Sequence, residues 1–153
     1  MSGDAVEDGA KRAVRATLVK VLLHRRTDRG MSLLEWASRC VRAGEVHELV
    51  VTDQWDPVAG ARIDRVGFLG FAEMECGGVV DRGDILRIGD TEVGPVLGFD
   101  GCHFPNHYNI LVHNPLLLTG GSLALRPESP VVFGPRPTAG QPAPAARPPT
   151  AKG

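Results

Sequence analysis

The sequence predicts a mainly β domain of the α+β class: a small closed or partly closed β-barrel with one α-helix in its N-terminal half. Many short apolar segments are separated by Gly, Pro and Asp, which is typical of barrels and closed sheets. A single segment, beginning at Ser32, has apolar residues at helical spacing. The length of 153 residues fits one domain.

We expect three regions along the chain. Residues 1–12 are polar and form a flexible N-terminus, and residues 13–133 form the barrel-like domain. Residues 134–153 are rich in Pro and Ala and form a disordered tail. An inert tail is the simpler expectation, and a proline-rich ligand for a partner domain is the alternative.

The helix is predicted from several local signals. Ser32 can cap its N-terminus, and Glu35, three residues later, completes a capping box. Gly44 suits the left-handed position just after the last turn. The apolar stripe consists of Leu33, Leu34, Trp36, Ala37, Cys40 and Val41.

The other elements are predicted as strands because apolar and β-branched residues fall between turn residues. The glycines within residues 62–76 predict bends or close approaches of the backbone. The expected strands lie in residues 13–24, 46–52, 62–76, 79–88 (two strands and a turn), 92–99, 108–113, 116–119, 123–125 and 131–133.

Composition and charge exclude several classes of function. The formal net charge is −1, whereas nucleic-acid-binding proteins usually carry a concentrated basic surface. No apolar run is long enough for a membrane span, and the first residues lack the apolar core of a signal peptide. The three cysteines are widely spaced, which argues against a disulfide framework. We therefore expect a cytoplasmic protein without nucleic-acid or membrane partners.

Residues 99–114 hold the densest group of reactive side chains, including three of the five histidines. Gly101 and Pro105 interrupt the segment, so we expect a loop between two strands. Functional groups often lie on loops that a rigid scaffold holds. A hydrogen-bonded turn is the alternative interpretation, because Asp and Asn are common turn residues.

We expect His103 and His107 to act as an acid–base pair, because imidazole gains and loses a proton near neutral pH. Asp100 would orient one imidazole, Tyr108 would supply a hydroxyl, and Glu73 would be a further acid or base if its strand face is sheltered. A solvated face is the alternative for Glu73 and its neighbour two residues on. The expected substrate-binding residues are Asn106, Asn109, Cys102, Glu75, Trp55 and His113.

The sequence contains no motif for a redox cofactor, and we expect a cofactor-free protein. A single divalent metal bound by His103 and His107 is the alternative, with His113, Glu73 or Glu75 as the third ligand. Cys102 would be a nucleophile only if a neighbouring histidine lowered the pKa of its thiol.

The run Gly98-Phe99-Asp100-Gly101-Cys102-His103-Phe104-Pro105-Asn106-His107-Tyr108-Asn109-Ile110 resembles the signature of an uncharacterised family of small actinobacterial proteins. The resemblance implies a setting near genes for natural-product and antibiotic biosynthesis. We therefore expect a lyase, isomerase or cyclase that acts on a small organic intermediate in a pocket at the barrel mouth. The reaction would be an isomerisation, cyclisation, elimination or hydration. A non-catalytic small-molecule-binding or accessory protein, a structural subunit and a His-ligated metalloenzyme are alternatives, and a homodimer is left open.

Overall fold

The structure, a computed structural model, describes residues 9–55 and 60–135. Within these ranges every regular element is a β-strand, so the predicted α+β class with one helix is wrong. The described residues form one eight-stranded sheet and two small two-stranded sheets. The strands are β1 (Val14–Val21), β2 (Arg25–Arg26), β3 (Met31–Ser32), β4 (Ser38–Val41), β5 (Val46–Thr52), β6 (Arg62–Ile63), β7 (Val66–Met74), β8 (Gly78–Asp81), β9 (Ile85–Ile88), β10 (Thr91–Asp100), β11 (Asn109–His113) and β12 (Pro130–Gly134).

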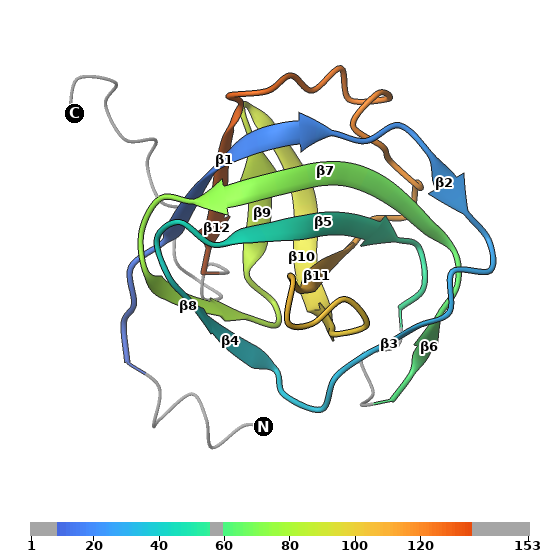
Figure 1. The fold of residues 1–153 in the computed structure, drawn as a ribbon, viewed down its shortest axis with the longest axis horizontal. Helices are drawn as coiled ribbons and strands as arrows, with labels where there is room; N and C mark the ends of the chain where they lie inside the picture. The colour runs from blue at the N-terminus through green and yellow to red at the C-terminus, as the bar shows by residue number, and fades with distance from the viewer. Residues whose placement is uncertain (1–8, 56–59, 136–153) are drawn as a thin grey trace, which may run out of the picture.

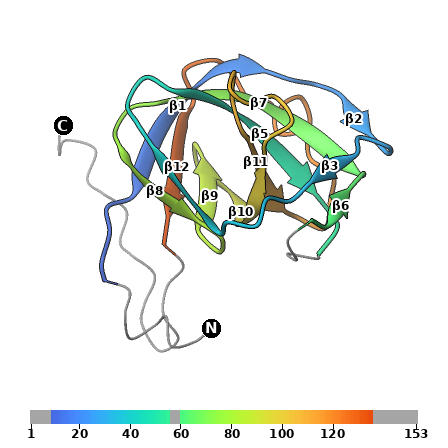
Figure 2. The same ribbon diagram turned by 60° about the horizontal axis from the view of Figure 1, so that its bottom comes forward.

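The large sheet curls back on itself. Its strand order is β1-β12-β9-β10-β11-β5-β7-β2, and an additional antiparallel pairing joins β1 to β7. The strands therefore form a partly closed ring with β2 at one edge (Figures 1 and 2). Strands β11 and β5 are parallel neighbours. Their pairing brings together two segments that are far apart in the sequence.

The main core fills the inside of the ring. Successive residues of a strand point to opposite faces of a sheet, and every strand of the ring except the short edge strand β2 contributes one face to a single cluster of buried apolar side chains. Phe99, Phe133 and Leu18 are among its largest fully buried members. Removing apolar surface from water contributes about 25 cal/mol per Å², so this shared interior is the main source of stability.

A second core lies on the outer face of the ring. Val50 and Leu111 belong to it, whereas their strand neighbours Leu49 and Ile110 belong to the main core. The short strands β3 and β6 pair with each other and cover this face, to which Met31 contributes. The segment from β2 to β3 therefore runs along the outside of the ring (Figure 2).

The predicted helix is absent, and its segment is extended. Other parts of the chain accept the hydrogen bonds of its N–H groups: Leu33 donates to the carbonyl of Ala61, and Leu34 donates to that of Phe99. The following residues form β4, which pairs with β8. The apolar stripe is not buried as one face, since Trp36 is 60% exposed. Tertiary pairing thus outweighs the local helix signals.

The strand predictions are confirmed in part. The strand predicted over residues 46–52 is β5 with the same ends. The strands predicted over residues 116–119 and 123–125 are wrong, because this region consists of turns and irregular loop. Thr119 and Ser122 exchange side-chain-to-backbone hydrogen bonds there. Such local bonds compete with strand pairing and stabilise a turn.

The glycines of β7 permit the close approach that the sequence predicts. Gly70 has a φ of 153°, and a Cβ at this position would overlap the carbonyl oxygen of Lys20 on β1. The pairing of β1 with β7 shifts register between Leu18 and Lys20, next to this contact. Only glycine fits there, so Gly70 lets the two strands that close the ring come together.

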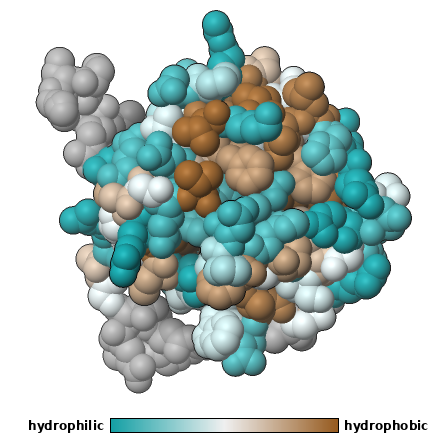
Figure 3. Space-filling view, viewed as in Figure 1, coloured by the Kyte–Doolittle hydropathy of each residue, from teal (hydrophilic) through white to brown (hydrophobic). Residues whose placement is uncertain are grey.

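Hydrophobic side chains gather in the upper part of the face drawn in Figure 3, where Figure 1 draws β1 and β7. Across residues 9–55 and 60–135, no helix has the length and apolar character that crossing a bilayer requires. The predictions of a flexible N-terminus and a disordered tail fall mainly on residues 1–8 and 136–153, which lie outside the described residues.

Candidate functional site

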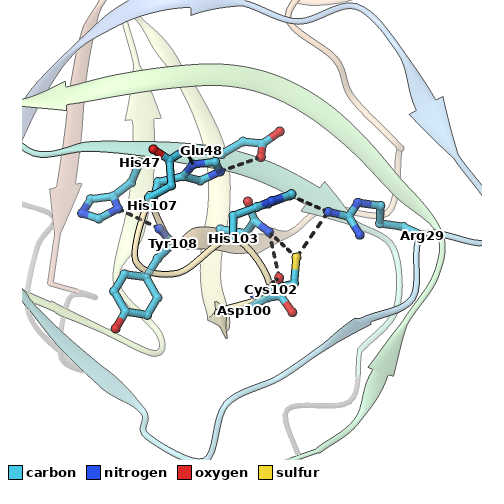
Figure 4. Close-up of polar contacts among 10 residues, drawn as sticks. Arg29, His47, Glu48, Asp100, Cys102, His103, His107 and Tyr108 are labelled. Atoms are coloured by element: carbon cyan, nitrogen blue, oxygen red, sulfur yellow. Dashed lines mark hydrogen bonds and ion pairs between the residues drawn. The ribbon is translucent and has the colours of Figure 1, made fainter.

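The loop between β10 and β11 lies beside β5 (Figure 4). It spans residues 101–108, one residue later than the gap between the predicted strands 92–99 and 108–113, and pairing of Asp100 with Asn109 closes it. The parallel pairing of β11 with β5 sets Glu48 opposite Asn109. Paired residues of neighbouring strands point to the same face, and this face is the outer one, which also carries Val50. The Glu48 carboxylate therefore lies at the base of the loop, outside the ring.

Two loop histidines and this strand carboxylate form a compact cluster. One nitrogen or oxygen atom from each of Glu48, His103 and His107 lies within 4.8 Å of the other two. His107 and Glu48 are buried, with 8% and 6% of their surface exposed. His103 is exposed. The cluster therefore has a buried base and an open side.

Both imidazoles are held in defined positions. Their rings stack with centroids 4.9 Å apart, and Phe71 packs edge-on against His107. Nε2 of His107 lies 3.3 Å from Oε1 of Glu48. Nδ1 of His107 lies 2.9 Å from the side-chain amide nitrogen of Asn106. Each ring nitrogen of this buried histidine thus has one polar neighbour.

A guanidinium faces the open side of the cluster. Nη2 of Arg29 lies 2.9 Å from Nε2 of His103 and 3.4 Å from Sγ of Cys102 (Figure 4). Because a guanidinium can only donate hydrogen bonds, Nε2 of His103 accepts here. The ring proton is then on Nδ1, and His103 is neutral in this arrangement.

Burial shifts two members of the cluster toward their neutral forms. It raises the pKa of the Glu48 carboxyl, and nearby positive charges oppose this change. Burial also lowers the pKa of His107, with a contribution from the charge of His47, and Asn109 opposes the change. A neutral imidazole is the form that binds a metal ion or accepts a proton.

Asp100 anchors the loop. Its Oδ1 accepts the N–H of Ser32, and its Oδ2 accepts the N–H of Cys102 and the side-chain amide of Asn109. Burial acts to raise the pKa of Asp100, but these hydrogen bonds hold it below its ordinary value. Among the described residues, its hydrogen-bond partners include no histidine. The predicted orientation of an imidazole by Asp100 therefore has no counterpart in this geometry.

Asn109 brings an unsatisfied acceptor to the site. Its Nδ2 donates to Asp100 and lies 3.5 Å from Sγ of Cys102. Its Oδ1 is buried and has no hydrogen-bond partner among the residues that the structure describes. An unpaired buried acceptor costs about 1–3 kcal/mol, so this oxygen marks a place for a ligand or water with a free donor.

Cys102 is a poor candidate for a nucleophile. Burial raises the pKa of its thiol, and its hydrogen bond to Asp100 adds to this increase. The thiolate, not the thiol, is the reactive form. Cys102 therefore contributes to the site through its contacts with Arg29 and Asn109.

The side chain of Tyr108 points away from the two loop histidines (Figure 4). Its ring lies 3.8 Å from the guanidinium carbon of Arg39 and packs near Phe104. Its backbone N–H donates to Nδ1 of His47. The hydroxyl that the sequence offered for catalysis therefore lies outside the cluster.

Four further predicted site residues also lie elsewhere. Glu73 and Glu75 are exposed, and Glu75 accepts a hydrogen bond from a threonine of β1. Trp55 packs edge-on against His113, with ring centroids 4.3 Å apart. In the described part of the chain, the third member of the cluster is Glu48 and not any of these four residues.

A cavity of about 1120 Å³ lies at a different place, around the turn between β8 and β9. Lys11, Trp55, Arg82 and Asp84 are among its lining residues, and the members of the histidine cluster are not. A ligand of the two histidines would therefore bind at the open side of the β10–β11 loop and not in this cavity.

Sequence reasoning missed Glu48 and Arg29. One signal for Glu48 was available: a carboxylate within the apolar strand over residues 46–52 must find a polar partner if it is buried. Arg29 carries no such signal, because arginine is common in exposed loops. Pairing of distant strands had to be known before either residue could be placed.

A protein-family model described as a family of unknown function (DUF6917) matches residues 8–134 of the chain. This match confirms membership of an uncharacterised family, without bearing on the loop signature or its actinobacterial setting. No curated protein and no solved structure matches the chain.

Proposed function

The chain belongs to DUF6917, a family of unknown function, and from its site we propose that it binds one divalent transition-metal ion. Glu48, His103 and His107 are the proposed ligands. Zn²⁺ is the best match, because it takes imidazole nitrogen and carboxylate oxygen together. The bound ion would support hydration, elimination or isomerisation of a small organic molecule.

The separation of the ligand atoms carries this proposal. Zn²⁺ binds nitrogen and oxygen ligands at about 2.0–2.2 Å with tetrahedral geometry, which places neighbouring ligand atoms about 3.3–3.5 Å apart. Nε2 of His107 lies 3.3 Å from Oε1 of Glu48. This distance matches the spacing of two zinc ligands and is long for a hydrogen bond. His103 lies on the exposed side, so a small side-chain movement brings it into reach.

The surrounding polar groups fit a bound ion. The oxygen and nitrogen of an Asn amide have nearly the same shape. With its oxygen turned toward the ring, Asn106 accepts the Nδ1 proton of His107 and leaves Nε2 free for the metal. Metal-binding histidines commonly donate their other N–H in this way. The unpaired Oδ1 of Asn109 offers an acceptor for a water bound near the ion.

Three protein ligands leave one position of a tetrahedral ion for water or substrate. A metal ion in such a site lowers the pKa of its bound water to about 7 and polarises a substrate carbonyl. These two effects suit lyase- and isomerase-type reactions. In this proposal the two histidines and Glu48 hold the ion, and Asn106 and Phe71 keep His107 in place.

A metal-free acid–base site is the second candidate. The contact between the Glu48 carboxyl and the His107 imidazole favours this candidate. Burial raises the pKa of Glu48 and lowers that of His107, so each change favours the neutral form. One group could then donate a proton while the other accepts. The exposed His103 would meet the substrate, and cyclisation joins the reactions open to such a site. This candidate is the cofactor-free enzyme that the sequence predicts.

Two further observations support a cellular compartment and a metabolic role for the protein. The three cysteines are free thiols, which fits a reducing compartment such as the cytoplasm. The likeness of the loop to small actinobacterial proteins supports a role in natural-product biosynthesis, with a small-molecule substrate.

Cobalt substitution tests the proposal. Co²⁺ takes the place of Zn²⁺ in many sites and has visible absorption bands that report its ligands. We expect intense tetrahedral bands with the wild-type chain, and their loss in His103→Ala and His107→Gln. Equal melting temperatures would show that both variants fold. Identical spectra of wild type and both variants would reject the proposed ligands.

A further inference from the structure

We propose that the metal centre acts on a small organic carboxylate and that Arg29 binds the carboxylate group of this substrate. This inference rests on the proposed metal site and names its substrate class. Arg29 is not among the proposed metal ligands, and its guanidinium lies beside the exposed ligand His103.

The guanidinium of Arg29 has donors to spare. Its two hydrogen-bond contacts, to His103 and Cys102, both come from Nη2. Among the described residues, Nη1 and Nε of Arg29 have no acceptor, and no carboxylate lies within ion-pair distance. Several other arginines have a carboxylate partner: Arg26 pairs with Asp28, and Arg62, Arg65 and Arg87 pair likewise with Asp or Glu.

The present partners of Arg29 are weak ones. A neutral imidazole nitrogen and a thiol sulfur bind a guanidinium less strongly than a carboxylate does. The planar fork of Arg matches the two oxygens of a carboxylate. An ion that took Nε2 of His103 would also displace the guanidinium from that nitrogen and free Nη2 for a ligand.

The charges around the loaded centre favour an anion. Glu48 and Asp100 supply two negative charges, Arg29 supplies one positive charge, and the ion supplies two more. The surplus is positive, and it lies at the open side where His103 is exposed. A carboxylate held by Arg29 would place the rest of a small substrate next to the free position of the ion.

The experiment is a titration of the Co²⁺-loaded protein with acetate, followed by visible absorption. Acetamide serves as the neutral probe of the same shape. The variant is Arg29→Gln, and Arg26→Gln is the control because it removes an exposed guanidinium from the same segment. The affinity of each protein for Co²⁺ is measured in the same series.

We expect acetate to change the spectrum saturably and acetamide to leave it unchanged. In Arg29→Gln the affinity for acetate should fall about tenfold to a hundredfold, as for loss of a charge-assisted hydrogen bond. The affinity for Co²⁺ should rise about tenfold, because a competing positive charge is gone. If Arg29 had only a structural role, Arg29→Gln would lower the affinity for acetate and the affinity for Co²⁺ together.

Each other outcome counts against the inference in a distinct way. If Co²⁺ binds but Arg29→Gln and Arg26→Gln bind acetate alike, the carboxylate assignment is wrong and the metal centre stands. If acetamide and acetate act alike, charge does not select the ligand. If the wild-type chain binds no Co²⁺, the metal centre and the inference fail together.

Discussion

Glu48 and Asn109 occupy the same register position on the parallel strands β5 and β11. This pairing places a buried carboxylate from one half of the chain at the base of a histidine-bearing loop from the other half. The loop supplies His103 and His107, and the strand supplies the third proposed ligand. The site is therefore a product of the fold and not of one sequence motif.

Glu48→Gln should lower the affinity for Zn²⁺ by at least about a hundredfold, because an anionic ligand becomes a neutral amide. Glu73→Gln is the matched control: Glu73 is an exposed glutamate of β7 outside the cluster. Competition with a chromogenic chelator measures both affinities. Equal losses in the two variants would point to a general effect of charge and not to a ligand at position 48.

Asp100→Asn should destabilise the fold by about 2 kcal/mol. The new amide would turn an N–H donor toward a group that now donates to the carboxylate. Chemical denaturation measures the change, with the exposed Asp90→Asn as control.

This effect of Asp100 should depend on pH in a defined direction. The pKa of Asp100 lies below its ordinary value of 3.8, so the carboxylate stabilises the fold fully above that pH. The contribution disappears as pH falls through the lower, folded-state pKa. The stability difference between wild type and Asp100→Asn should therefore shrink in acid, and a difference that grows in acid would contradict the assigned hydrogen bonds.

Lys11 should stabilise the fold through its ion pairs with two aspartates. Its Nζ lies 2.7 Å from Asp81 and 2.5 Å from Asp84, and Asp84 is buried. Lys11→Met leaves that buried carboxylate without its counterion and should cost about 2–3 kcal/mol, less than for a fully buried pair because Lys11 is partly exposed. Lys20→Met, at an exposed lysine of β1, should be nearly neutral in the same denaturation experiment.

The stabilising effect of Lys11 should be lost in alkali. Burial acts to lower its pKa, but the hydrogen bonds to Asp81 and Asp84 raise it above 10.5. The contribution is thus complete below pH 10.5 and declines as pH rises through the higher, folded-state pKa. Stability curves of wild type and Lys11→Met should converge there, and parallel curves would exclude the ion pairs as the cause.

Gly70→Ala should prevent normal closure of the ring. The added Cβ would overlap the carbonyl of Lys20, and the φ of 153° is one that other residues rarely adopt. We expect a loss of at least about 3 kcal/mol. Gly44→Ala is the control, because Gly44 also has a positive φ, of 91°, but has open space around it. It should lose only about 1 kcal/mol, and equal losses would mean that the β1–β7 contact is unimportant.

The sequence predicted the strands best where apolar residues and turn residues alternate. Residues 46–52 were placed correctly because Val46, Leu49, Val50 and Val51 give the segment strand character and polar residues and Gly bound it. The helix prediction failed because Leu33 and Leu34 serve two different cores, one outside and one inside the ring. A local stripe cannot reveal which of two cores will bury each residue.

The loop was identifiable from its side chains, but its partners were not. Most of the other predicted site residues lie within six positions of His103 or His107 in the sequence. Their closeness along the chain is enough to group them. Glu48 and Arg29 join them only through the β5–β11 pairing and the outer path of the β2–β3 segment. Tyr108 shows the reverse case: it follows His107 in the sequence, but its ring packs near Phe104 and Arg39.

Calorimetric titration of the chelator-treated, full-length protein with Zn²⁺ tests the central claim most directly. We predict saturable binding of one ion per chain with a dissociation constant at or below about 1 μM, and loss of this binding in the double variant His103→Ala, His107→Gln. No saturable binding by the wild-type protein, or the same binding by a folded double variant, would contradict the metal centre built from Glu48, His103 and His107.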